Sequence, residues 1–191
     1  MRIILMLALA ATLSMNLNGC VPVVAGGAAA GGLAAADRRT TGAYVGDEEI
    51  EIKALDRINK ALGDKIHVNV TSYNGNVLLT GEAVDEASKA KAESIAKEVR
   101  DVRSVTNELS IGSASSLTSR SNDAYITSKV KARMVSENLF PANYVKVVTE
   151  NSVVYLMGMV TRKEAEDAVQ IARGTEGVEK VVTVFEYVVV E

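Results

Sequence analysis

Three side chains at a spacing of four residues could meet an anionic surface. A helix would place Tyr125, Lys129 and Arg133 on one ridge, and Lys131 adds a third cation to the same segment. The ring and polar tip of a tyrosine suit the interface between lipid head groups and acyl chains. A cation near an anionic bilayer contributes about 1 kcal/mol. We therefore predict a weak site for anionic lipid on this helix.

Two apolar residues, Ile126 and Leu139, join the candidate lipid contacts. Ile126 directly follows Tyr125, and Leu139 stands in a Leu139-Phe140-Pro141 loop that has no helical phase. A wedge from Tyr125, or from Leu139 and Phe140 in this loop, would contribute a few kcal/mol at most, by an order-of-magnitude estimate. The alternative is that the ridge is an ordinary solvated helix face and that Tyr125 packs on a neighbouring domain.

The only cysteine, Cys20, closes an export signal. An apolar run from residue 3 to 13 follows a basic start and is too short to span a membrane. The motif Leu17-Asn18-Gly19-Cys20 resembles a bacterial lipobox, in which residues 1–19 are removed and the cysteine receives acyl chains, palmitate among them. Two or three chains anchor a protein stably. Val21 after the cysteine favours sorting to the outer membrane, facing the periplasm, by resemblance to enterobacterial lipoproteins.

Other chemistry is poorly supported. His67 is the only histidine, so the sequence cannot assemble a His/Cys metal cluster or a Cys–His dyad. The carboxylates form no recognisable catalytic pair, and the glycines do not form a phosphate-binding loop. A net charge of -3 is not that of a general nucleic-acid binder. We expect no enzymatic activity, no metal, no cofactor and no nucleic-acid partner.

The chain contains an internal repeat. Residues 68–81 and 145–158 align without a gap and are identical at six positions of fourteen, four of them apolar and two apart within each half. This period predicts two strands, and Asn74-Gly75 between them is a strong hairpin signal. Gly81 and Gly158 close the copies, where we expect a bend that leaves no room for a side chain.

The repeat extends into two domains of the α+β class. We expect each to run helix, strand, strand, helix, strand, with a three-stranded mixed sheet packed against two helices. In the first copy the helix is expected from Asp47 to Leu62, with the acids of residues 47–49 in its first turn, and the last strand over 102–111. In the second the helix is expected from Asn122 to Asn138, with Ile126, Val130 and Met134 facing the core, and the last strand over 178–190. The predicted boundaries are an acylated N-terminus and flexible tether over 20–46, domains over 47–112 and 121–191, and a Ser-rich linker over 113–120.

This arrangement resembles tandem BON domains, and behind a lipobox it is similar to the dual BON-domain outer-membrane lipoproteins of gamma-proteobacteria. The resemblance covers essentially the whole mature chain. Its most specific segments are Ser121-Asn122-Asp123, Ile126-Thr127, Lys129-Val130, Val145-Lys146-Val147, Thr149-Glu150-Asn151 and Leu156-Met157-Gly158. The first copy departs from the family pattern at Asp101-Val102, where the second has the usual Gly177-Val178.

The resemblance implies a non-enzymatic protein of the periplasmic face of the outer membrane. Its second domain would bind anionic phospholipid such as phosphatidylglycerol or cardiolipin, and its role would be to keep the outer membrane intact. The residues add an independent comparison, because segment 47–62 has five acids and three bases whereas segment 122–138 has two acids and three bases. Two alternatives stay open: a module that docks an envelope protein, with the anchor giving location only, and an acidic first domain that contacts basic partners.

Overall fold

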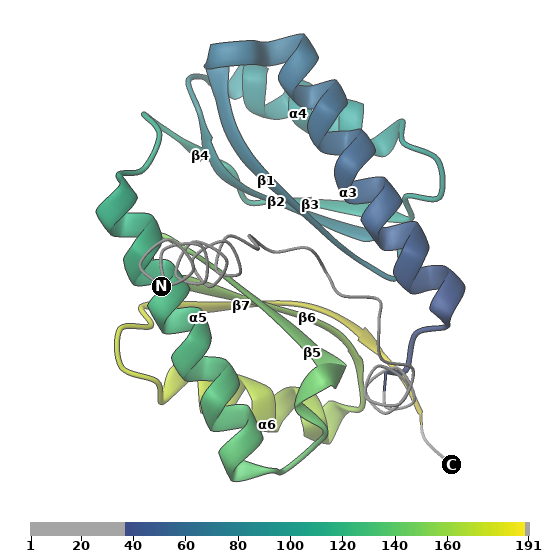
Figure 1. Cartoon of the computed structure of the whole chain (residues 1–191), viewed down its shortest axis with the longest axis vertical. Helices are drawn as coiled ribbons and strands as arrows, with labels where there is room; N and C mark the ends of the chain where they lie inside the picture. Colours follow the sequence, from purple (N-terminus) through teal and green to yellow (C-terminus); the bar gives the residue numbers. More distant parts are fainter. Residues whose placement is uncertain (1–36, 190–191) are drawn as a thin grey trace, which may run out of the picture. The chain divides into compact units, whose positions relative to one another are not determined.

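Both predicted hairpins are present in the computed structural model, which describes residues 37–189. The first repeat comprises α3 (Thr41–Leu62), β1 (Ile66–Tyr73), β2 (Asn76–Ala83), α4 (Glu86–Lys97), β3 (Ser104–Asn107) and β4 (Ser110–Ile111). Strand β2 is central, antiparallel to β1 and parallel to β3 and β4. Both helices cover the same face of this sheet (Figure 1). The predicted mixed sheet is confirmed, with four strands in the first repeat instead of the three expected.

The second repeat has the same plan. Helix α5 (Leu117–Glu137) precedes β5 (Val145–Glu150), β6 (Val153–Val160), α6 (Arg162–Arg173) and β7 (Lys180–Tyr187). Short 3-10 turns, η2 (Gly63–Lys65) and η3 (Ala142–Tyr144), lead into the first strand of each repeat. The sheet order is β5-β6-β7, with β6 antiparallel to β5 and parallel to β7. The α+β class and the element order follow the prediction.

At the exit of each hairpin the glycine leaves no room for a side chain, as predicted. A side chain on Gly81 would begin 2.1 Å from the carbonyl oxygen of His67, and one on Gly158 would begin 2.2 Å from that of Tyr144. Gly81 also has φ of 112°, a backbone conformation that other residues rarely adopt. The second strand of each hairpin can therefore approach the backbone at the start of the first strand this closely only at a residue without a Cβ atom.

Both first helices start earlier than predicted. Helix α3 begins at Thr41, capped by the side chain of Thr40, rather than at Asp47. Helix α5 begins at Leu117, capped by Ser116, so half of the predicted linker is helical. A Ser or Thr at the N-cap satisfies a backbone N–H that would otherwise lack a partner. The acid-rich first turn expected around Asp47 therefore lies in the second turn of α3.

Asp47 has a structural role that its counterpart repeats. It is buried and accepts hydrogen bonds from the Ser72 hydroxyl (2.6 Å) and from the backbone N–H groups of Asn74 and Gly75 (both 2.8 Å). In the second repeat Asp123 is buried in the same way. It accepts from the N–H groups of Asn151 (3.0 Å) and Ser152 (2.9 Å). Each aspartate thus fixes its helix on the adjoining hairpin turn.

The folded part also reaches further towards the N-terminus than the predicted tether allowed. Arg39 has only 7% of its side chain exposed and binds Asp37 and Asp47 at 2.8 and 2.9 Å. Arg38 binds Glu164 through both guanidinium nitrogens (2.6 and 2.9 Å). Burial alone would raise the pKa of Glu164, but the hydrogen bonds from Arg38 and Thr161 lower it. Residues 37–46 are therefore part of the folded unit, and Cys20 lies outside the described residues.

The last strands differ from prediction. The expected strand over 102–111 is interrupted between β3 and β4, where Asn107 binds back to the Lys89 carbonyl oxygen at 3.0 Å. Strand β7 is unbroken from Lys180 to Tyr187 and shorter than the expected 178–190. The polar Asn107 prefers these local contacts to a continued ladder, whereas β7 has no such interruption.

Candidate functional site: the outward face of α5

The buried side of α5 fixes which residues face outward. Ile126, Val130 and Met134 are almost fully buried against the second sheet, as the helical spacing predicted. Asn138 ends the helix in a left-handed conformation, and its N–H binds the Met134 carbonyl oxygen. With one side set by the core and by Asp123, the opposite side cannot rotate inward.

This opposite side is a run of small and apolar residues, which we call the outward stripe. Among its members Tyr125 is 63% exposed, Val135 66% and Leu117 77%. Leu139, just beyond the helix, is 57% exposed. All positions of the stripe are exposed: Leu117, Ser121, Ala124, Tyr125, Ser128, Ala132 and Val135. None of them is acidic.

Basic residues flank the outward stripe on both sides. By helical phase Arg120 and Lys131 lie along one flank, and Lys129 and Arg133 along the other. Arg120 and Lys131 are exposed, and Lys131 forms no ion pair with the residues that the structure describes. An exposed apolar strip between two rows of cations is the pattern of a helix that lies in a membrane interface.

The second flank is already engaged within the protein. Lys129 is half-buried, donates to Glu176 at 2.9 Å and has its ammonium nitrogen 5.1 Å from the centre of the Tyr125 ring. The hydrogen bond from Lys129 lowers the pKa of Glu176. These contacts hold Lys129 beside Tyr125 and partly neutralise its charge.

Arg133 ties α5 to the end of α6. It binds Glu137 at 2.7 Å and donates to the Ile171 carbonyl oxygen (3.0 Å) and to the Thr175 hydroxyl (3.1 Å). A guanidinium with three internal partners is fixed in position and contributes mainly to packing. Arg133 therefore borders the predicted site without being free to follow a ligand.

Two residues proposed for lipid contact lie elsewhere. Ile126 is only 1% exposed and is part of the core, so its inclusion among the contact residues was wrong. Phe140, considered as a wedge, is 4% exposed in the same core, and only its neighbour Leu139 faces outward. An apolar side chain that already contacts the core has no surface left to give to a bilayer.

Sequence reasoning missed several members of the site. Leu117 and Arg120 precede the predicted start of the helix, and Ser116 was the signal that could have placed them in it. Ala132 and Val135 lie seven and ten residues after Tyr125, in the same helical phase. The predicted site was defined mainly by its charges, whereas the outward stripe consists mainly of small and apolar residues.

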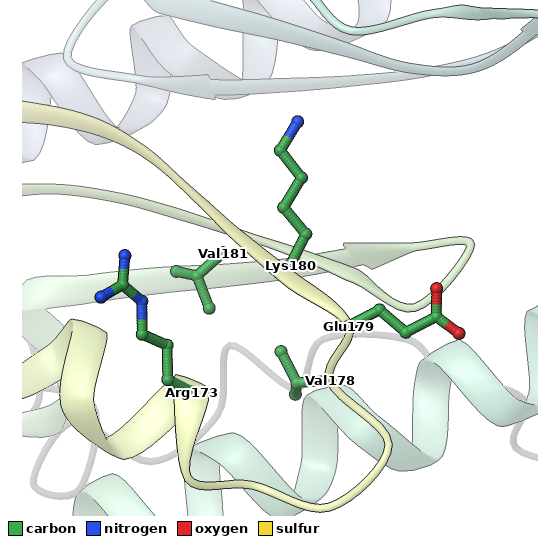
Figure 2. A pocket seen from close by; sticks show the side chains of 5 residues that line it. All are labelled: Arg173, Val178, Glu179, Lys180 and Val181. Carbon is green, nitrogen blue, oxygen red and sulfur yellow. The ribbon is translucent and has the colours of Figure 1, made fainter.

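Other regions offer less. A pocket between the end of α6 and the start of β7 is lined by Arg173, Val178, Glu179, Lys180 and Val181 (Figure 2). Within residues 37–189 no three His, Cys, Asp or Glu side chains are grouped to hold a metal ion. His67 contacts Glu82 at 3.1 Å instead. None of the helices described is long and apolar enough to cross a membrane.

Comparison with known proteins identifies the family. The BON domain matches the chain twice, over residues 46–113 and 122–188. The outer membrane lipoprotein DolP of Haemophilus influenzae is 40% identical over 173 residues, which cover 90% of each chain. The 21 kDa hemolysin of Actinobacillus pleuropneumoniae is 33% identical, covering 80% of this chain and 79% of the relative.

A third relative matches a smaller part of the chain. The osmotically-inducible protein Y of Escherichia coli is 31% identical over 60% of this chain and 58% of its own. None of these three relatives is named as an enzyme. The chain therefore belongs to the BON-domain family, among the outer-membrane lipoproteins that resemble DolP.

Proposed function

We propose that this protein is held on the periplasmic face of the outer membrane by acyl chains on Cys20 and binds anionic phospholipid through the outward stripe of α5. Phosphatidylglycerol and cardiolipin are the ligands that we propose. No chemical step is involved, and the role is to support the integrity of the outer membrane. We expect the predicted tether, of which residues 20–36 lie outside the described part of the chain, to let the folded unit reach the bilayer that holds its anchor.

One observation carries this proposal. The outward stripe contains no acid, whereas the equivalent exposed positions of α3 include Glu48, Glu49 and Asp56. The repeat pairs these with Ala124, Tyr125 and Ala132. An acid on the contacting face would be repelled by lipid phosphates, so its removal from three positions at once suits a surface that meets anionic head groups.

The expected affinity is low but sufficient. Arg120 contacts the Ser115 carbonyl oxygen (3.1 Å) and the His67 ring (3.4 Å), and neither Arg120 nor Lys131 is paired with a carboxylate of residues 37–189. Each cation contributes about 1 kcal/mol near an anionic surface. Partial burial of the Tyr125, Val135 and Leu139 side chains adds a few kcal/mol, by an order-of-magnitude estimate. Because the anchor keeps the site at the same membrane, a weak contact is occupied much of the time.

Vesicle binding tests the proposal. Residues 36–191 form one compact unit, so a fragment that starts at residue 37 can be measured without its acyl chains. We expect it to co-sediment with phosphatidylcholine vesicles that contain phosphatidylglycerol or cardiolipin, to bind pure phosphatidylcholine weakly, and to be released by salt. Absence of binding at low salt would remove the lipid role and leave α5 as a surface for an envelope protein.

A single substitution locates the surface. Tyr125→Glu restores the residue of the first repeat and should weaken binding roughly five- to tenfold, because it exchanges an interfacial ring for a charge that lipid phosphate repels. Ile52→Glu is the matched control, since Ile52 is equally exposed (66%) but lies on α3. Equal losses in the two variants would show that α5 has no special part. In cells, the full chain with Tyr125→Glu should leave the outer membrane more permeable to large polar dyes.

A further inference from the structure

The edge strand of the second sheet is continuous and open. Strand β7 pairs with β6 along all eight residues, from Val153↔Lys180 to Val160↔Tyr187, and within residues 37–189 it pairs with no other strand. No side chain of that part of the chain hydrogen-bonds to the backbone of β7. An unprotected row of N–H and C=O groups is a template for another strand.

The corresponding edges of the first sheet are protected. Strand β3 has only four residues before Asn107 turns aside to bind the Lys89 carbonyl oxygen and Glu93. On the other edge, Glu51 accepts the Ser72 N–H of β1 at 2.7 Å. Interruption and side-chain capping are common ways of blocking an edge. Strand β7 of the second repeat has neither form of protection.

The apolar side chains on both faces of β7 are only partly buried. Val181 and Phe185 pack on the helix-bearing core, while Val182 and Val184 pack in a second cluster on the other face of the sheet. Figure 2 shows Lys180 and Val181 projecting to opposite sides of the strand. All four apolar side chains are partly exposed, whereas Val154, Leu156 and Met157 of β6 are fully buried. A further strand beside β7 would extend both clusters.

The sequence of β7 is complementary to itself. If two copies run antiparallel with Thr183 opposite Thr183, then Val182 faces Val184 and Val181 faces Phe185. The same register places Lys180 opposite Glu186 at both ends. Each pair keeps its side chains on one face of the joined sheet, and opposite charges and branched–aromatic pairs are favourable cross-strand neighbours.

We propose that β7 is a self-association edge, at which a second copy of this chain adds its own β7 and forms a continuous six-stranded sheet. Glu186 can take part because Asn74 and Arg103 both contact its Oε2 atom (2.8 and 3.4 Å), and Oε1 accepts from neither. This surface is separate from α5, so lipid binding and pairing can occur together. One short strand gives a weak contact, which anchoring in a membrane strengthens by raising the local concentration.

Disulfide trapping of the full, acylated chain in detergent and in vesicles tests the register. A Thr183→Cys variant should form a covalent dimer under mild oxidation, because the two Thr183 side chains would be direct cross-strand neighbours. Ser110→Cys is the control, since Ser110 is exposed on the interrupted edge of the first sheet. Trapping of Thr183→Cys no faster than Ser110→Cys would overturn the proposal.

Charge reversal provides a second test by sedimentation of the full chain. Lys180→Glu and Glu186→Lys should each reduce the dimer fraction, roughly fivefold to tenfold, because each places like charges opposite one another at both ends of the pairing. The double variant restores opposite charges and should recover the dimer. Dimers that survive both single reversals would place the contact elsewhere, and a monomer at every accessible concentration in detergent and in vesicles would exclude it. A failure here with intact vesicle binding leaves the lipid role untouched.

Discussion

Helices α3 and α5 occupy the same place in their repeats but present different surfaces. Both bury an aspartate and an apolar stripe against the adjoining sheet. Outward, α3 carries Glu48, Glu49 and Asp56, and the last two pair with Lys53 and Lys60 along the helix. The outward stripe of α5 has no acid. The core therefore fixes the fold of each repeat, while the exposed face of its first helix is free to acquire a separate role.

The edge strands of the two sheets also differ. In the first repeat the edge strand β3 is short and followed by a break, whereas β7 in the second is long and uninterrupted. Both differences concern residues that do not hold the core together. The second repeat is thus the one in which both surfaces suited to binding, helix face and strand edge, are available.

The largest effect should come from replacing the glycine at the hairpin exit, which both repeats share. Gly81→Ala should destabilise the protein by roughly 3–5 kcal/mol, since it adds both backbone strain and overlap with the His67 carbonyl oxygen. Gly158→Ala has the overlap without a positive φ and should cost roughly 1–3 kcal/mol. Urea unfolding measures both, with Gly46→Ala as a control because open space surrounds its Cβ position. Equal losses at Gly81 and Gly158 would show that the strain is unimportant.

Exchange of the two helix faces should have the next largest effect. The triple variant Ala124→Glu, Tyr125→Glu, Ala132→Asp gives α5 the acids of α3 and should weaken binding to phosphatidylglycerol vesicles roughly 100-fold, at about 1 kcal/mol for each charge. The folded state should be retained, because all three positions are exposed. The reverse exchange on α3, Glu48→Ala, Glu49→Tyr, Asp56→Ala, should strengthen the binding of α3 to the same vesicles. A weak effect of the first variant would show that the acids of α3 do not account for the difference between the two helix faces.

A buried acid of the second repeat should make stability depend on pH. Burial raises the pKa of Glu150, and the charges of Glu82 and Asp123 raise it further against a hydrogen bond from Asn69. The folded state therefore favours the protonated form, so this group destabilises the fold as pH rises through its pKa. We expect Glu150→Gln to be more stable than the wild type at pH 8, with the gap closing below the ordinary glutamate pKa near 4.5. A gap independent of pH in thermal unfolding would contradict this.

The smallest effect concerns the partner of Lys129. Glu176→Gln removes the charge that Lys129 contacts at 2.9 Å and should strengthen vesicle binding a few-fold, because a cation without a partner is attracted more strongly to lipid phosphate. Glu179→Gln, in the same loop, removes an equal charge without that contact and serves as the control. A rise of the same size in both variants would indicate a general effect of net charge.

Much of the fold was predictable because its signals are local. The period of two in the hairpins, the period near 3.6 in α4 and α6, and the paired glycines each follow from neighbouring residues. The helix starts were placed late, since Thr40 and Ser116 cap without the acidic run that drew attention to Asp47. Of the candidate contact residues, Tyr125, Lys131 and Leu139 are exposed and Ile126 is not. That they bind lipid stays a prediction.

The sequence by itself determined the duplication, the α+β order of each repeat and the contrast in charge between the two first helices. These properties depend on residue type and spacing along a few turns or strands. Only the tertiary structure decided which cations remain available, because Lys129 binds Glu176, 47 residues away along the chain, and Arg133 binds the Ile171 carbonyl oxygen, 38 residues away. It likewise decided that Asp47 and Asp123 hold the hairpin turns and that β7 forms an open edge. Contacts between distant segments arise from packing, which local spacing does not specify.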